Sequence, residues 1–377
     1  MPRAAAPRDL AGALLLSLAF GSIHAFGVLM APLEQALGAS RGAVSLVYSL
    51  AIASLTLGVF TAPRFLPLGA SWLAALCGLC AALGIAATAL LATPLAAWAG
   101  FGVVFGFCNG VAYSLFLSRA AAALPASPGL AAGLVTAAYG LGAAGFAQVL
   151  GLALPRLNWA QVLYGFAAAI LVAGLAAAAL FGREAAAPGR TAGDRPPAAF
   201  TRRLWLVYFL GASGGLMVIA HAAGIVAPAA SATTLVAVGN VAGSLLGGVA
   251  GERLAARLSL ALPLALTAAA LGLLLAVPAA GLALLGLCGF AYGWLIAAIP
   301  VVIRQSLGAA AFAPAFGRVF TAWGVAGLVA PSLAGLLYDW SGGYGGAIGL
   351  ALAAALAGLL LVSSGAAFQV RSPPPQR

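Results

Sequence analysis

Residues 10–36 read LAGALLLSLAFGSIHAFGVLMAPLEQA, and the first charged side chain in this stretch is Glu34. A helix needs about 20 consecutive apolar residues to cross a hydrocarbon core of roughly 30 Å. The stretch is long enough, and it lacks the alternation of apolar and polar residues that a barrel strand would show. A helix also satisfies its own backbone hydrogen bonds in lipid. We therefore predict a transmembrane helix over residues 10–36.

Eleven further stretches of the same kind follow, separated mostly by very short loops. The sequence thus predicts an all-α membrane protein with twelve transmembrane helices. Their approximate limits are 10–36, 43–62, 70–92, 95–119, 129–154 and 159–182, then 204–227, 232–251, 258–278, 280–304, 315–338 and 346–368.

The composition excludes two other classes. Of the 377 residues, 64% are hydrophobic and only 6% are charged, against roughly 25% charged in soluble domains. So high a hydrophobicity also excludes intrinsic disorder. The formal net charge of +11 could suit a nucleic-acid-binding protein. However, the arginines are scattered singly between apolar stretches and form no basic face, so the predicted partner is the lipid bilayer and not nucleic acid.

A polar, proline-rich segment divides the chain. It spans residues 183–203, and it predicts an N-terminal six-helix bundle over 1–182, a cytoplasmic linker, and a C-terminal six-helix bundle over 204–377. Its charged residues and prolines are Arg183, Glu184, Pro188, Arg190, Asp194, Arg195, Pro196, Pro197, Arg202 and Arg203.

Arginine positions predict the orientation. If the N-terminus is cytoplasmic, fifteen arginines fall on the cytoplasmic side, and only Arg41 and Arg156 fall on the outer side. Such a bias follows the positive-inside rule. We expect a multi-pass protein of the cell inner (plasma) membrane with both termini in the cytoplasm.

The two halves carry matching stretches. Gly-Phe-Cys-Asn-Gly at 106–110 matches Gly-Phe-Ala-Tyr-Gly at 289–293, which sets Asn109 over Tyr292 at an offset of 183. Tyr139 falls over Trp323 at an offset of 184. The only two histidines, His24 and His221, lie 197 residues apart in the first and seventh stretches. Matches of this kind are typical of transporters built from duplicated halves.

Four stretches carry a resemblance to a known family. They are residues 25–29 (AFGVL), 215–221 (GLMVIAH) and 317–327 (GRVFTAWGVAG), and a loop pattern made by Gly248, Glu252, Arg253 and Arg257. Together they resemble the major facilitator superfamily, and within it the oxalate/formate antiporter and monocarboxylate transporter group. The resemblance implies two pseudo-symmetric six-helix bundles that rock about a central cavity lined by helices 1, 4, 7 and 10.

The chain departs from that group at two positions. Ser244 stands where the group usually has an arginine that binds the substrate carboxylate, and Ala326 stands where oxalate-type members have a lysine. These departures argue against oxalate, a dianion, as the substrate.

Few polar side chains lie within the predicted helices. A charge there costs about 2.5–3.5 kcal/mol on insertion scales, and the carboxylates all fall at helix ends or in loops. His24 and His221 are therefore predicted as a symmetric imidazole pair that binds substrate, the alternative being neutral histidines bonded to helix carbonyls. Further candidate substrate-binding residues are Asn109, Tyr113, Tyr139, Tyr292 and Trp323, whereas for Gln148 and Asn240 we expect hydrogen bonds between helices.

Two charged sets lie at the predicted cytoplasmic ends. Gly248, Glu252, Arg253 and Arg257 form a candidate conformational gate that binds a neighbouring helix end in one state and releases it in another. Arg119 and Arg304 end the fourth and tenth helices. They are candidates for an inner-mouth charge that attracts anions, or for anchors that extend to the headgroups.

The sequence favours a carrier over an enzyme, because it shows no clustered nucleophile or carboxylate pair. The Cys77/Cys80 spacing lacks the further ligands of a metal site, so neither a metal nor a cofactor is expected. We expect a secondary active or facilitative transporter of a small organic solute, a monocarboxylate-like weak acid, by alternating access. A proton or a counter-transported anion is the candidate coupling partner. The alternatives are a multidrug-type exporter of amphipathic compounds and a channel or receptor.

Overall fold

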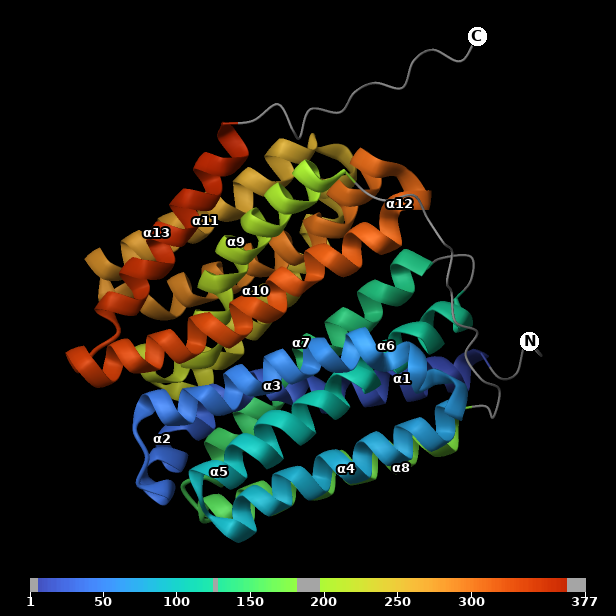
Figure 1. Ribbon diagram of the computed structural model, residues 1–377. Coiled ribbons are helices and arrows are strands. Elements are labelled where there is room, and N and C mark those ends of the chain that lie inside the picture. Colours follow the sequence, from blue (N-terminus) through green and yellow to red (C-terminus); the bar gives the residue numbers. More distant parts are fainter. Residues whose placement is uncertain (1–5, 125–127, 182–196, 365–377) are drawn as a thin grey trace.

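The protein is helical throughout the residues that the computed structural model describes, 6–124, 128–181 and 197–364. Twelve segments of this part are long and apolar enough to cross a membrane. Their limits lie within several residues of those predicted from the sequence. The expectation of an all-α membrane protein is thereby confirmed (Figure 1).

The first half contributes six spans. The first span is interrupted by a 3-10 turn, and the fourth begins with a π-helical stretch. In chain order the elements are α1 (Ala6–Gly21), η1 (Ser22–Ala25), α2 (Phe26–Leu37), α3 (Arg41–Thr61), η2 (Ala62–Arg64), η3 (Leu66–Leu68), α4 (Ala70–Leu91), α5 (Pro94–Ala96), η4 (Ala97–Phe105), α6 (Gly106–Ala123), α7 (Pro128–Ala153) and α8 (Trp159–Leu180).

The second half contributes the other six. Its elements are α9 (Ala198–Ile225), α10 (Ala229–Arg253), α11 (Ala256–Ala276), η5 (Pro278–Ala280), α12 (Gly281–Ser341) and α13 (Gly345–Ser363). Helix α12 contains two spans, because the chain bends at Gly308, where φ is +74°. That left-handed conformation favours glycine, which has no Cβ to collide with the backbone.

The predicted linker over 183–203 overlaps the structure only at its end. Helix α9 begins at Ala198 and so includes the last six residues of that segment. Residues 183–196 of the linker lie outside the described residues.

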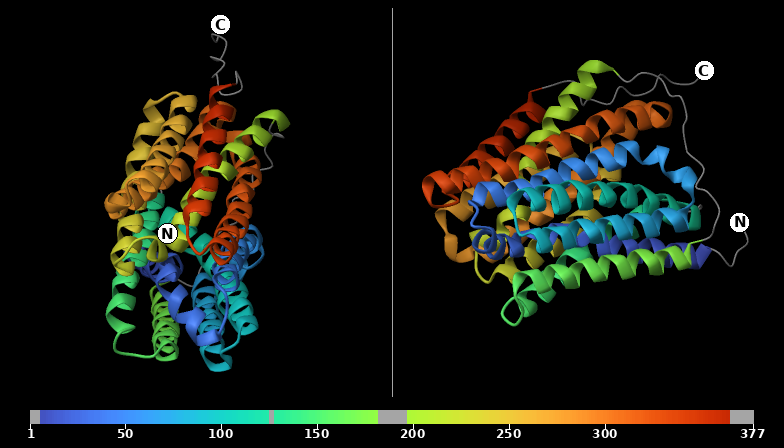
Figure 2. Two further views of the ribbon diagram at one scale, coloured as in Figure 1. Left: turned by 90° about the vertical axis from the view of Figure 1, so that its left-hand side faces the viewer. Right: turned by 60° about the horizontal axis from the view of Figure 1, so that its bottom comes forward.

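The two halves form separate layers, and three helix pairs make the most extensive contacts between them. These are α3 with the second part of α12, α7 with α10, and α2 with α9. The two layers are distinct in Figure 1, and Figure 2 shows the same helices from two further sides. Small residues allow the close approach. A Cβ on Gly27 would lie 2.6 Å from the Ala220 carbonyl oxygen, and one on Gly324 would lie 2.6 Å from Thr56 Oγ1. Close packing of this kind lets one half move against the other without large side chains interlocking.

Contacts between the halves follow only part of the length of these helices. Between α7 and α10 they run from Gly151 and Ala230 at one end to Gly140 and Val241 near the middle. We call the end at which α2 leads into α3 the closed end, and the end at which α1 begins and α13 finishes the terminal end. Toward the terminal end the two layers diverge (Figure 1).

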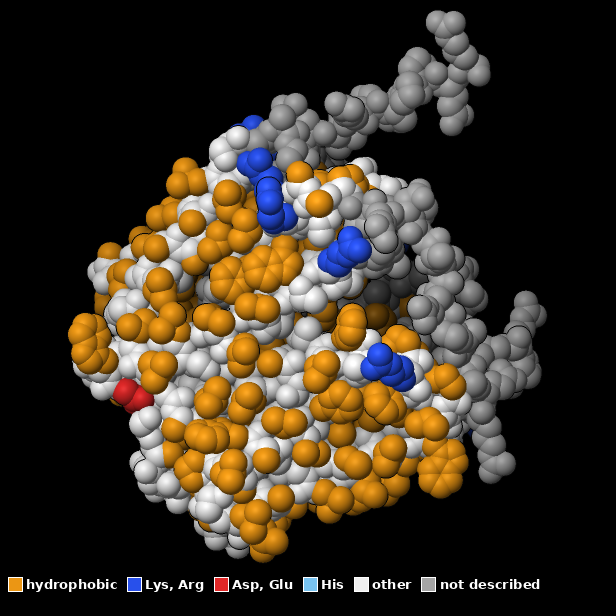
Figure 3. All heavy atoms as spheres, in the orientation of Figure 1, with side chains coloured by type: hydrophobic (Ala, Val, Ile, Leu, Met, Phe, Trp, Pro, Cys, Tyr) orange, Lys and Arg blue, Asp and Glu red, His pale blue; other side chains and the backbone are white. Residues whose placement is uncertain are grey.

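The surface has the polarity of a membrane protein. Hydrophobic side chains are spread over the whole face in Figure 3, and the arginine side chains on it gather toward the terminal end. A recess separates the two layers on that side (Figure 3). The distribution agrees with the arginine bias of the sequence.

Candidate functional site

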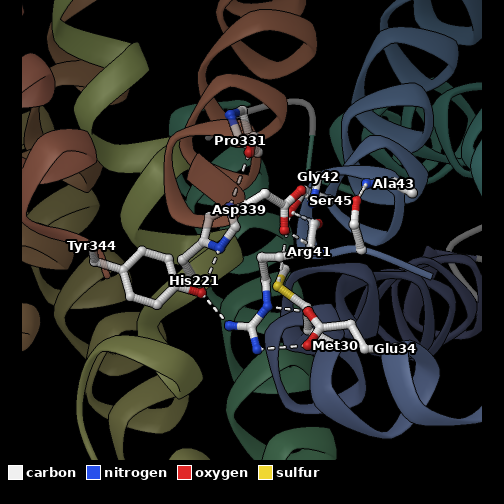
Figure 4. A network of polar contacts seen from close by, with 11 residues as sticks. Met30, Glu34, Arg41, Gly42, Ala43, Ser45, His221, Pro331, Asp339 and Tyr344 are labelled. Atoms are coloured by element: carbon white, nitrogen blue, oxygen red, sulfur yellow. Dashed lines mark hydrogen bonds and ion pairs between the residues drawn. The ribbon is translucent and has the colours of Figure 1, made fainter. Parts of the chain in front are cut away.

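The closed end is held by a carboxylate that crosses between the halves. Asp339, near the end of α12, accepts hydrogen bonds from the backbone N–H groups of Arg41 (2.9 Å) and Gly42 (2.8 Å) (Figure 4). These two groups begin α3, and the N-terminus of a helix carries a partial positive charge. Asp339 of the second half therefore caps a helix of the first half.

The Arg41 side chain adds further links at this end. Its guanidinium forms an ion pair with Glu34, with Nη2 donating to Oε2 at 2.7 Å. Nη1 donates to the Tyr344 hydroxyl at 2.5 Å. The guanidinium carbon also lies 4.5 Å from the centre of the Tyr338 ring. One arginine of the first half thus contacts two aromatic residues of the second.

The Tyr344 hydroxyl bonded to Arg41 also contacts His221. Burial raises the pKa of Tyr344 to about 12, although the nearby Arg41 charge opposes the shift. The phenol consequently keeps its proton at neutral pH and can donate it to His221 Nδ1, 3.0 Å away. His221 Nε2 then donates to the Pro331 carbonyl oxygen at 3.0 Å (Figure 4). We call Glu34, Arg41, His221, Asp339 and Tyr344 the closed-end network.

The two histidines predicted as a symmetric pair have different surroundings, and their binding role stays a prediction. His221 is fully buried and uses both ring nitrogens in the closed-end network, whereas His24 is bonded through Nδ1 to the Tyr48 hydroxyl at 2.7 Å. The physical cause is local. His24 lies in the 3-10 turn η1, while His221 lies in the uninterrupted helix α9. Just before η1, Gly21 packs so closely on the Tyr139 backbone that a Cβ would collide with it.

The matched positions of the two halves do form equivalent hydrogen bonds. Tyr139 donates through its hydroxyl to Asn109 Oδ1 at 3.0 Å, and Trp323 donates through Nε1 to the Tyr292 hydroxyl at 2.7 Å. Each bond joins the fourth span of one half to the fifth span of the same half. Asn109 also donates through Nδ2 to the Phe20 carbonyl oxygen at 2.8 Å. The structural equivalence that the sequence offsets imply is confirmed for these pairs.

Other aromatic side chains pack on Tyr139 and on Trp323. Tyr113 meets Tyr139 edge to face at 5.8 Å between ring centres, and Phe320 stacks on Trp323 at 5.4 Å. His24 lies edge to face with Tyr139 at 5.5 Å. Such groups offer flat apolar surfaces with single polar tips, which suits a small amphipathic solute. The binding role of these residues stays a prediction.

Arg119 requires a correction. Both interpretations of its sequence position placed the guanidinium at the membrane surface, yet Arg119 is only 1% exposed. Its Nη2 lies 3.6 Å from Asp9 Oδ2, and its guanidinium carbon lies 5.7 Å from the centre of the Phe181 ring. The paired carboxylate offsets the cost of burying the charge. Arg304, the other candidate inner-mouth charge, is exposed.

The candidate gate lies at the terminal end. Glu252, Arg253 and Arg257 are exposed, and a Cβ on Gly248 would meet open space. Arg257 Nη2 donates to the Ser363 carbonyl oxygen at 2.6 Å, a bond within the second half. Its gating role stays a prediction.

Gln148 behaves as expected of a helix-to-helix contact. Its Nε2 donates to Thr234 Oγ1 at 2.7 Å, which joins α7 to α10 across the two halves. Asn240 instead lines a small cavity between the halves. In the described part of the chain no group of three or more His, Cys, Asp or Glu side chains could hold a metal ion.

Sequence reasoning missed the closed-end network as a site. A signal was present, because Arg41 is one of only two arginines on the expected outer side, and Glu34 and Asp339 belong to the same side. Opposite charges confined to one end of the bundle could have suggested contacts between them.

Comparison with known proteins identifies the fold. No protein-family model and no curated protein sequence matches the chain. Among solved structures, the xylose transporter XylE from E. coli in its inward open conformation is similar with a TM-score of 0.77 and 14% identity, over 96% of this chain and 98% of that one. The nucleoside transporter NupG gives 0.71 and 16%, over 95% and 98%.

A third similar structure is a bacterial homologue of the human lysosomal transporter Spinster, inward-facing and unoccupied. It gives a TM-score of 0.68 with 14% identity, over 98% of this chain and 96% of that one. Likeness at such identities defines the fold. The chain shares the major facilitator fold of these three transporters, with twelve membrane-length helical segments among its described residues.

Proposed function

We propose that this protein is a secondary active or facilitative transporter that moves a small organic solute by alternating access. The observation that carries the proposal is the unequal contact between the halves. They are joined by the closed-end network, and they diverge toward the terminal end. Two bundles with one closed and one open end are one of the two states that alternating access requires.

The solved structures support an inward-open state. XylE gives a TM-score of 0.77 in its inward open conformation and 0.69 in a partially occluded inward open conformation. The arginine bias of the sequence favours a cytoplasmic position for the terminal end. On this proposal the protein lies in the cell inner membrane with both termini cytoplasmic, and the described conformation opens inward.

A monocarboxylate-like weak acid is the substrate class we favour. Each half holds a group that can donate a hydrogen bond to one carboxyl group. Tyr292 accepts from Trp323 and keeps its own hydroxyl proton, and Asn109 has two amide N–H groups, one of which donates to the Phe20 carbonyl oxygen. Ser244 stands where the resemblance expects an anion-binding arginine. Its Oγ donates to the Gly293 carbonyl oxygen at 3.2 Å and so faces α12. The arrangement suits a weak acid better than a dianion, and a proton or a counter-transported anion stays the proposed coupling partner.

A multidrug-type exporter is the second candidate. The observation in its favour is the stack of Phe320 on Trp323, which offers a wide apolar surface. Amphipathic compounds bind surfaces of this kind without a charged partner.

Reconstitution into liposomes tests the function. We expect saturable uptake of one or more radiolabelled monocarboxylates, competed by unlabelled acid, and stabilisation of the purified protein against heat by the same acids. Uptake and stabilisation by amphipathic cations alone would favour the exporter. Absence of both for acids and cations would contradict transport of either class.

A further inference from the structure

A small cavity lies between the two halves near the middle of the bundle. The first half lines it from η1 and α7, and the second half lines it from α9 and α10. Its volume is about 10 Å³, which is room for one water molecule or one hydroxyl group. The lining residues are His24, Gly140, Ala143, Ile219, Thr233, Val236, Ala237 and Asn240.

Thr233 brings an unused hydroxyl to this cavity. Its side chain is only 2% exposed, and within the described part of the chain Oγ1 has no hydrogen-bond partner. The next residue differs, because Thr234 donates to the Ala144 carbonyl oxygen and accepts from Gln148. A buried hydroxyl without a partner is destabilising unless a bound group completes it. Thr233 therefore points to a ligand of the cavity.

His24 and Asn240 supply complementary groups from the two sides. His24 lines the cavity and uses Nδ1 for the Tyr48 hydroxyl, so Nε2 is the ring nitrogen that this bond leaves for a ligand. Asn240 offers an amide with both a donor and an acceptor. The rest of the lining is alanine, valine, isoleucine and glycine. An uncharged group that both donates and accepts fits such a lining, whereas an ion would lose its hydration without gaining an opposite charge.

We propose that this cavity is a hydroxyl subsite of the transport pathway, in which Thr233 and Asn240 of one half and His24 of the other bind an uncharged hydroxyl group of the solute. The inference rests on the proposed function and narrows it to hydroxylated solutes, of which 2-hydroxy acids are the simplest that also carry a carboxyl group. Because the subsite includes both halves, the hydroxyl bridges them. Water offers the same chemistry, and the experiment separates the two sources.

The test uses two acids that differ by one hydroxyl, lactate and propionate. Binding of each to the purified full-length protein is measured by calorimetry, for the wild type and for Thr233→Val, which keeps the shape and removes the hydroxyl. We expect the wild type to bind lactate about five- to tenfold more tightly, the usual effect of one neutral hydrogen bond. In Thr233→Val the ratio of the dissociation constants for propionate and lactate should fall close to one. Thr233→Ser retains a hydroxyl and should keep most of the preference for lactate.

Three results overturn the inference. The first is an equal lactate preference in the wild type and in Thr233→Val. The second is no preference in the wild type together with an ordered water in the cavity when lactate is bound, which would make this a water site only. The third is a loss of preference in Thr233→Ser as large as in Thr233→Val, since this would reflect altered packing. If the wild type bound and transported no solute of any class, the proposed function would itself fail, and the subsite with it.

Discussion

The two ends of the bundle use their charged residues differently. At the closed end, Asp339 and Arg41 join one half to the other. Toward the terminal end, Arg119 pairs with Asp9 inside the first half, and Arg257 bonds to α13 inside the second. On the proposed alternating-access cycle, contacts between the halves must break when the closed end opens, whereas contacts inside a half can persist. We therefore expect the first set of charges to affect the conformation and the second set to affect the stability of each bundle.

The largest effect is expected from breaking the buried pair inside the first half. In Asp9→Ala the Arg119 charge loses its carboxylate, and removal of one member of a buried ion pair typically costs about 3–5 kcal/mol. We expect a strong fall in the free energy of unfolding, measured by denaturant titration in detergent. The distance between spin labels on opposite halves should stay unchanged, because both residues belong to one half.

A double variant provides the control for this pair. Asp9→Leu combined with Arg119→Met removes both charges and leaves apolar groups in their place, so most of the lost stability should return. If the distance between spin labels on opposite halves changed in Asp9→Ala, the proposed distinction between the two ends would fail.

The second largest effect is expected at Asp339. Asp339→Ala removes two hydrogen bonds to the start of α3, and because the carboxylate is exposed to solvent each contributes about 0.5–1.5 kcal/mol. The population of states open at the closed end should rise by roughly tenfold or more. Pulsed electron-spin measurements between labels at Gln35 and Trp340, both exposed and on opposite halves, report the change.

The matched control for Asp339 is an exposed carboxylate at the other end. Glu252→Ala lies in the candidate gate, which in the described conformation is exposed. We expect no widening between the Gln35 and Trp340 labels in this variant. Equal widening in both variants would show that overall charge, and not the cap on α3, holds the closed end.

Sequence alone predicted the features that depend on local composition or on internal repetition. The length of each apolar stretch determined the twelve spans, since the bilayer thickness imposes that length. The offsets of 183 and 184 residues anticipated that Asn109 with Tyr139, and Tyr292 with Trp323, would be equivalent pairs. Duplication preserves such contacts, because both partners are repeated together.

Features that depend on distant segments were not predictable in this way. Arg41 and Asp339 lie 298 residues apart, and no periodicity connects them. Asp9 and Arg119 each read as a helix-end charge, and only the packing of α1 on α6 buries them together. His24 and His221 have different hydrogen-bond partners because His24 lies in the turn η1, which begins where Gly21 packs on the backbone of Tyr139. A linear comparison of the halves shows the two histidines as equals and misses that contact.

The smallest effect is expected at Tyr344, which extends the closed-end network to His221. Tyr344→Phe removes one hydrogen bond between the halves, from Arg41, and one within the second half, to His221. Asp339→Ala removes two between the halves, and a single hydrogen bond contributes about 0.5–1.5 kcal/mol. The label distance should therefore widen in fewer molecules than in Asp339→Ala. Tyr164→Phe on α8, whose side chain is 43% exposed, should leave the distribution unchanged.

The same residue predicts a pH effect with a defined sign. Burial raises the pKa of Tyr344 to about 12, above the usual value of about 10. A group whose pKa is raised in the closed state stabilises that state fully below its ordinary pKa, and this contribution disappears as the pH rises from about 10 towards 12. The wild-type label distribution should be constant from pH 8 to 9.5 and shift towards the open state at pH 11. Tyr344→Phe should show a smaller shift over the same range, and a shift of equal size would assign the titration to another group.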